Sequence, residues 1–245
     1  MARVRIEADY IDLDDPMLVE GLPGAGLVGK IAADHLARGL DTTYYGSVYC
    51  DGLPSIAVYQ GEDSTLRPPV RLYAAESEDL LVLRSDIPVS PSSAPDFASC
   101  LTDWIIDNGV LPLYLSGLGE QKEGAPNLYG VSTAGGEALL EEAGIVPPAD
   151  GGLVSGPTGA LLSRAEFSNV DSVGLIIECD GQFPDPEAAR VLLDAGIAPL
   201  TGIDVDTEAL TEQAEEIRAA RERLARQMGE ADDASSEAQP LRMFQ

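Results

Sequence analysis

The chain has 245 residues, of which 44% are hydrophobic, enough for one sizeable α/β domain with a buried core. Its 42 acidic and 15 basic residues give a formal net charge of −27, and no basic stripe is present to bind nucleic acid or an anionic membrane. The acids are spread over the whole chain, which predicts adaptation to a very salty cytosol where ions screen their repulsion. With no apolar run of about 20 residues and no signal-peptide core, the sequence predicts a soluble, cytoplasmic protein.

Strand-like and helix-like segments alternate along the chain. Short apolar or β-branched runs predict strands, and apolar residues three or four apart predict helices. The expected strands are residues 4–13, Met17–Val19, Tyr44–Tyr49, the hairpin pair Ile56–Tyr59 and Val70–Tyr73, Leu80–Leu83, Leu111–Leu115 and Val173–Ile177. The expected helices are Ile31–Leu36, one capped by Asp96 and stopped at Asn108-Gly109, Gly135–Ala143, one from the Ser155–Gly159 turn through Phe167, and Pro186–Ala195, stopped at Gly196. The alternation predicts an α/β fold: a mostly parallel sheet with helices on both faces.

The end of the chain differs in composition from this α/β domain, which we place at residues 1–206. Apolar residues spaced three and four apart predict a long amphipathic helix over 207–228. We expect this helix to pack on its own domain, with a seam between subunits as the alternative. Residues 229–245 begin with small and acidic residues and are expected to be a disordered tail.

A glycine-rich turn, GLPGAGLVGK from Gly21 to Lys30, joins the second expected strand to the first expected helix. Gly24, Gly26 and Gly29 fit the dinucleotide pattern G-x-G-x-x-G, for which Asp51 could be the ribose-binding acid. Gly24, Gly29 and Lys30 also fit the start of a phosphate-binding P-loop, but the next residue, Ile31, lacks the hydroxyl that would hold Mg²⁺. The third interpretation, which we favour, is a structural turn that packs helix against strand and binds no cofactor.

The turn also carries a resemblance. The sequence from Glu20 to Gly29, followed by Ala32, Ala33 and Leu36, resembles the opening signature of the proteasome assembly chaperone family. The similarity continues through Asp51–Pro54, Ser116–Gly119 and Val154–Gly159, and covers the chain to about Leu200. It implies a self-associating α/β subunit that binds proteasome subunits, with a sheet like that of nucleoside phosphorylases and no established catalytic chemistry. The aromatic residues Tyr44, Tyr45 and Tyr59 could serve self-association, or could simply pack in the core.

Candidate catalytic and metal-binding groups are few. Ligands of such sheets bind at the carboxyl ends of the strands, where Glu178 and Asp180 could hold Mg²⁺. We favour ordinary strand-end acids in an acid-rich chain, and therefore no metal. His35 is the only histidine, so no Ser-His-Asp set is supported, and the three cysteines form no C-x-x-C pair.

The last three residues, Met243-Phe244-Gln245, are apolar again after the acidic tail. They resemble the hydrophobic–tyrosine–any tripeptide by which proteasome activators and assembly chaperones dock between α subunits, with Phe244 in place of tyrosine. Two function classes follow. The first, which we favour, is a non-enzymatic chaperone or adaptor of the proteasome core particle. The second is a nucleotide- or nucleoside-binding enzyme that uses the Gly21–Lys30 turn.

Overall fold

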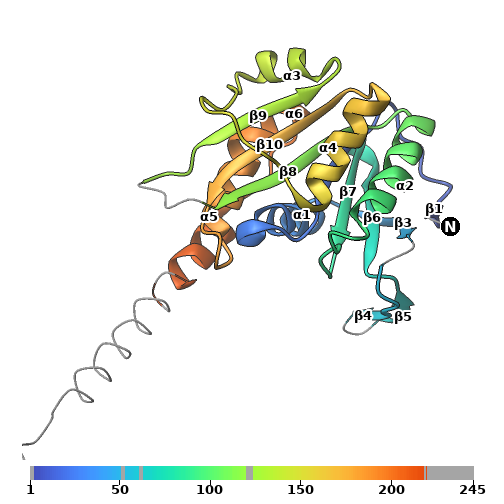
Figure 1. Cartoon of the computed structure of the whole chain (residues 1–245). Coiled ribbons are helices and arrows are strands. Elements are labelled where there is room, and N and C mark those ends of the chain that lie inside the picture. The colour runs from blue at the N-terminus through green and yellow to red at the C-terminus, as the bar shows by residue number, and fades with distance from the viewer. Residues whose placement is uncertain (1–2, 51–52, 61–62, 120–123, 218, 220–245) are drawn as a thin grey trace, which may run out of the picture.

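An eight-stranded sheet lies between two layers of helices in the computed structural model of the chain, which describes residues 3–50, 53–60, 63–119, 124–217 and 219 (Figure 1). The strand order is β1-β3-β6-β7-β2-β8-β10-β9, and β4 and β5 form a separate two-stranded sheet. The strands are β1 Arg3–Ile6, β2 Met17–Gly21, β3 Thr43–Tyr49, β4 Val58–Gln60, β5 Asp63–Arg67, β6 Val70–Ala75, β7 Leu80–Ser85, β8 Leu111–Gly119, β9 Leu128–Thr133 and β10 Ser172–Cys179.

The centre of the sheet is parallel and both of its edges are antiparallel. Strands β7, β2, β8 and β10 run parallel to one another. On one side β6, β3 and β1 follow in antiparallel pairs, and on the other side β9 pairs antiparallel with β10. The α/β class is confirmed, and the parallel arrangement is confined to the four central strands of a mixed sheet. Their carboxyl ends meet at one edge of the sheet, which is where ligands bind in folds of this type.

Helices cover both faces of the sheet, as predicted. The helices are α1 Val28–Gly39, α2 Ala94–Asp107, α3 Gly136–Ala143, α4 Gly156–Ser168, α5 Pro186–Leu192 and α6 Ala198–Thr201, with short 3-10 turns at Ala25–Leu27 and Glu76–Glu78. Alternate residues of a strand face opposite sides, so Val19 packs in the cluster under α1 and α5 whereas Leu18 packs in the cluster under α2 and α4. Two separate cores therefore fix the sheet from both sides.

Several predicted element boundaries are wrong. The first strand ends at Ile6 rather than near Leu13, and β8 continues through the expected loop Ser116–Gly119. The expected hairpin of Ile56–Tyr59 with Val70–Tyr73 does not form: β4 pairs with β5, and β6 joins the main sheet between β3 and β7. All six residues of β6 are buried, which is the pattern of an interior strand rather than of a surface hairpin. Helix α2 begins at Ala94 after Ser93, before the expected cap at Asp96.

The predicted stop at Gly196 is also wrong. The chain passes from α5 through a π-helical turn, Leu193–Ile197, into α6, and ends at Gly202, whose φ is +74°. A Cβ on Gly196 would lie 2.9 Å from Leu175 Cδ1 and 3.1 Å from Leu128 Cδ2. Glycine is needed there because the turn packs closely on β10 and β9, and it does not end the helix.

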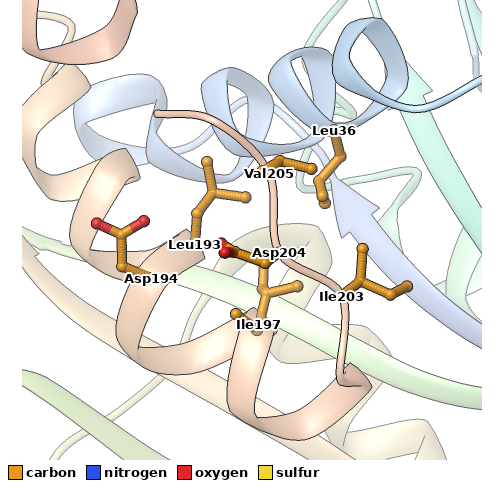
Figure 2. Close-up of a pocket in the computed structure, with 8 residues that line it drawn as sticks. Leu36, Leu193, Asp194, Ile197, Ile203, Asp204 and Val205 are labelled. Atoms are coloured by element: carbon orange, nitrogen blue, oxygen red, sulfur yellow. The ribbon is translucent and has the colours of Figure 1, made fainter. Parts of the chain in front are cut away.

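The segment after α6 returns to α1. Residues 203–205 run between α1 and the π-helical turn, and the side chains of Leu36, Leu193 and Val205 fill the crevice so tightly that no water fits (Figure 2). His35 Nε2 lies 2.6 Å from the carbonyl oxygen of Asp206 and donates to it. Residues 208–217 are helical, and Leu210 is buried in the α1–α5 core. The start of the predicted 207–228 helix thus packs on its own domain; the range beyond 219, including the predicted tail at 229–245, lies outside the described residues.

Candidate functional site

The glycine-rich turn after β2 packs closely against β8 and the end of β10. Gly26 has φ +60°, and a Cβ there would lie 3.0 Å from both Cys179 Sγ and the carbonyl oxygen of Asp180. Its own carbonyl oxygen accepts a hydrogen bond of 2.9 Å from the Asp185 amide. A Cβ on Gly29 would approach Leu115 Cβ to 3.1 Å, whereas one on Gly24 would meet nothing within 4 Å. Gly26 and Gly29 are therefore required by protein contacts, while Gly24 is not.

A buried carboxylate, that of Glu20, fills the space between β2, β8 and α4. The ladder between β2 and β8 ends at the pair Val19 and Leu113, and the two strands part beyond it. There Glu20 accepts hydrogen bonds from the Leu22 amide at 2.8 Å, the Leu115 amide at 3.1 Å and the Thr158 hydroxyl at 3.2 Å. Its side chain thus satisfies backbone donors that the diverging strands leave without a ladder partner.

Burial has a large effect on the ionisation of Glu20. Removal of the carboxylate from water raises its pKa to about 7, although the three hydrogen bonds act in the opposite direction. The neighbouring phenol of Tyr114 is also buried, and its pKa is raised by burial and by the charge of Glu20. The three protein donors account for the hydrogen bonding of this buried carboxylate.

Lys30, the basic residue of the P-loop interpretation, pairs within its own helix. Its Nζ lies 3.0 Å from Oδ2 of Asp34, one turn later on α1, and Asp34 Oδ1 accepts a second bond of 2.7 Å from Arg84 Nε on β7. Burial opposes ionisation of Asp34, but the hydrogen bonds and charges of these two cations outweigh it and lower the pKa of the carboxyl. The Asp34–Arg84 pair joins α1 to β7, and Lys30 is held by the same carboxylate within α1.

The acids after β10 are used locally. Glu178 accepts hydrogen bonds from the Asn127 amide and side chain and from the Tyr129 hydroxyl. Asp180 accepts from the amides of Gln182 and Phe183 and so closes a tight turn. Within the described ranges, no group of three or more His, Cys, Asp or Glu side chains is arranged to hold a metal ion.

Other predicted groups are separated or lie elsewhere. Cys179 is buried beside Gly26, whereas Cys50 and Cys100 are half-buried. Asp51 and the tripeptide Met243, Phe244 and Gln245 lie outside the described residues. No helix in the described part of the chain is long and apolar enough to cross a membrane.

The sequence analysis missed the role of Glu20. Glu20 was noted there only as the first residue of the family signature Glu20–Gly29. A signal was present: Glu20 is an acid at the end of a buried strand run, between Val19 and Gly21. Since an acid is almost never fully buried unless it is hydrogen-bonded or paired, that position indicated a specific internal partner.

The fold and the strand-end geometry define an α/β scaffold whose ligand-binding edge, at the glycine turn, is packed with the protein's own groups. The PAC2 family model matches residues 18–225, and the chain belongs to that family. The resemblance to the proteasome assembly chaperone family is thereby confirmed.

Relatives of known sequence or structure cover almost the whole chain. An uncharacterized protein of Methanocaldococcus jannaschii is 31% identical over 224 residues, which are 91% of this chain and 90% of the relative. The crystal structure of Pyrococcus furiosus PbaA, described as an archaeal homolog of proteasome-assembly chaperone, has a TM-score of 0.77 and 26% identity, and the match covers 95% of this chain and 100% of that one. P. furiosus PbaB, described as an archaeal proteasome activator, matches with a TM-score of 0.75 and 24% identity, over 91% of this chain and 98% of that one, and shares the fold.

Proposed function

We propose that this chain is a non-enzymatic proteasome assembly chaperone or adaptor, which acts as a homo-oligomer in the cytoplasm and binds α subunits of the proteasome core particle. The observation that carries the proposal is family membership together with the match to PbaA over 95% of the chain. The proposal places the partner contact in the last three residues, Met243, Phe244 and Gln245, and treats the α/β domain as the scaffold that presents them.

The strand-end geometry supports a binding protein over the alternative nucleotide enzyme. A phosphate loop needs free backbone amides and a lysine directed at the phosphates. Here the turn packs on Cys179 and Asp180 at Gly26, and Lys30 is paired with Asp34. The buried Glu20 lies between β2, β8 and α4 and accepts hydrogen bonds from the Leu22 and Leu115 amides, so these strand-end donors are not available to a phosphate.

In this proposal the side chains of the tail supply the chemistry for docking in a protein pocket. Phe244 would be the buried aromatic anchor, and Met243 the adaptable apolar neighbour. Gln245 would occupy the third position of the tripeptide, at which the resemblance allows any residue. Several tails on one oligomer would raise the effective concentration and offset weak single contacts.

The test is binding to purified proteasome core particle in molar KCl, with three variants of the full-length chain. Deletion of 243–245 and Phe244→Ala should each weaken binding at least tenfold, because each removes the anchor. Phe244→Tyr should bind as well as the native chain or better, since it restores the usual residue of the tripeptide.

The matched control is Leu241→Ala, which shortens an apolar residue of the same tail outside the tripeptide. It should leave binding within about twofold. Equal binding by the native chain, the deletion and Phe244→Ala would show that the tail has no such role; no binding by the native chain would contradict the proposed function itself.

A further inference from the structure

The π-helical turn Leu193–Ile197 connects α5 to α6 without a break in the helical run. A π turn closes i→i+5 hydrogen bonds, and such turns are rare and are frequently found at functional sites. Leu193 and Ile197 face Leu36 of α1 and the returning segment 203–205 across the closed crevice (Figure 2). The turn therefore packs against the stretch of chain that leads into the C-terminal helical residues.

Asp194, inside the π-helical turn, joins α5 to the beginning of these helical residues. Its Oδ2 accepts a hydrogen bond of 2.8 Å from Arg190 Nη1 on α5, and its Oδ1 accepts one of 3.2 Å from the Thr207 hydroxyl. A threonine in front of a helix commonly uses its hydroxyl to cap that helix. Here the hydroxyl donates to Asp194, and Asp206 Oδ1 accepts from the Glu208 amide at 2.9 Å. A residue suited to local capping is thus used for a contact with the domain.

Helix α1 and the core hold the same stretch from the other side. The carbonyl oxygen of Asp206 accepts a hydrogen bond of 2.6 Å from His35 Nε2. Leu210 is fully buried in the core cluster under α1 and α5. A backbone oxygen, a hydroxyl and an apolar side chain are therefore all fixed within this short stretch. We call His35, Asp194 and the core contact of Leu210 the socket, and residues 208–217 the arm.

The arm leaves the domain directly after the socket. Leu210 is the last buried residue of the described chain, and residues 211–217 are exposed or half-buried. Figure 1 shows the arm at the edge of the molecule, directed away from the sheet. Its helical residues span about 15 Å, so a change of direction at the socket moves the far end of the arm by a distance of the same order. The orientation of the arm is thus set at the socket.

We propose that the socket positions the C-terminal docking residues: by fixing the direction of the arm, it limits the positions that Met243, Phe244 and Gln245 can sample and so raises their affinity for the proteasome core particle. The socket residues are then positioning residues, which touch the arm and not the partner. A segment already held near its bound orientation loses less freedom on binding, and aligned tails of one oligomer have a higher effective concentration. The inference rests on the proposed function and adds to it a part of the domain that acts on the partner site from a distance.

The first experiment separates positioning from stability. Full-length Leu210→Ala and Leu140→Ala are compared with the native chain for binding to purified core particle in molar KCl. Both substitutions shorten a buried leucine of the same core cluster, but Leu140 lies on α3, at the other end of the molecule from the arm (Figure 1). Leu210→Ala should weaken binding by about fivefold or more. Leu140→Ala should bind within about twofold of the native chain, although its melting temperature falls.

Thr207 offers a finer pair of variants. Thr207→Val keeps the shape of the side chain and removes the hydroxyl that donates to Asp194, whereas Thr207→Ser keeps the hydroxyl. Thr207→Val should weaken binding to the core particle by about threefold, because one hydrogen bond of the socket is lost. Thr207→Ser should bind like the native chain, which a role of the side-chain shape alone would not produce.

The second experiment observes the arm directly. A spin label is attached at Gln213→Cys, an exposed position of the arm, in a chain whose two half-buried cysteines are replaced by alanine. Electron paramagnetic resonance then reports the mobility of the arm without the core particle. The label should be more mobile in Leu210→Ala and in Thr207→Val than in the native chain, and should not change in Leu140→Ala.

Three results would overturn the inference. They are native binding by Leu210→Ala, an equal loss of binding in Leu140→Ala, which would show that stability alone governs binding, and unchanged label mobility in a weakened Leu210→Ala. Deletion of 243–245 distinguishes this failure from failure of the proposed function. If the deletion leaves core binding unchanged, the proposed function is wrong and the inference falls with it. If the deletion abolishes binding while Leu210→Ala binds like the native chain, the function stands and only the role of the socket is lost.

Discussion

The carboxyl ends of the central strands and the β4–β5 hairpin are opposite kinds of surface. At the strand ends, where α/β sheets bind ligands, the glycine turn, Glu20 and the end of β10 occupy the space themselves. At the hairpin, large apolar side chains project beside an open, uncharged groove. In this chain the usual ligand site has therefore become part of the scaffold, whereas large exposed apolar side chains lie at the hairpin.

The largest expected effect follows from filling the closed region further. Gly26→Val places a branched side chain at φ +60° and drives its Cβ against Cys179 and Asp180. Backbone strain of about 1–3 kcal/mol adds to overpacking of about 1–3 kcal/mol, so the free energy of unfolding should fall by about 4 kcal/mol. Chemical denaturation in molar KCl measures it.

Gly24→Ala is the control for that change within the same turn. A Cβ at Gly24 meets nothing within 4 Å, and its φ of −140° suits any residue. The free energy of unfolding should change by less than about 0.5 kcal/mol. A Gly26→Val protein as stable as Gly24→Ala would mean that the turn is open, as a nucleotide loop would be.

A smaller effect is expected from the pH dependence of Glu20. Its folded pKa, about 7, is raised above the ordinary value of 4.5, so between these pH values the folded state binds more protons than the unfolded state. Stability from this group is therefore complete below about pH 4.5 and is lost as the pH rises through 7. The difference between these two pKa values corresponds to a loss of stability on the order of 3 kcal/mol.

Glu20→Gln isolates this effect from the general repulsion among the other acids, which also grows as the pH rises. The variant should lack the Glu20 contribution, so the difference in stability between native and variant chains should shift in favour of the variant from pH 4.5 to pH 8. At low pH the variant should be less stable, because an amide nitrogen would face either the Leu22 or the Leu115 amide, and all three partners of Glu20 are donors. Parallel pH profiles of the two proteins would show that Glu20 titrates normally.

The sequence was sufficient where structure is set locally. Gly109 and Gly144 end α2 and α3 with φ of +62° and +68°, as their positions after helical patterns indicate. The apolar runs of β7 and β10 likewise indicated interior strands of the sheet, because a strand that is apolar on both faces must be covered on both. The family signature likewise led to the correct family, because the order of several glycine motifs is specific.

The sequence was not sufficient where distant segments decide the structure. Val70–Tyr73 has the same composition whether it pairs with β4 or enters the main sheet, and only the partners β3 and β7 settle the matter. Gly196 looks like a helix stop, yet it is selected by Leu175 and Leu128 across the core. The donors around Glu20 come from the following turn, from β8 and from α4, so its environment could not be read from its neighbours alone.

The smallest expected effect concerns Lys30, where the two interpretations of the turn separate most clearly. Lys30 is a quarter exposed and pairs with Asp34 at one helical turn, while Asp34 keeps its 2.7 Å contact with Arg84 when Lys30 is removed. Lys30→Ala should therefore lower the free energy of unfolding by no more than about 1 kcal/mol, and less in molar KCl because salt screens the pair. Isothermal calorimetry with ATP should show no micromolar binding by either protein, since the closed turn offers no phosphate site. If the native chain instead bound ATP with micromolar affinity and Lys30→Ala abolished that binding at unchanged stability, Lys30 would be a phosphate ligand and the closed-site interpretation would be wrong.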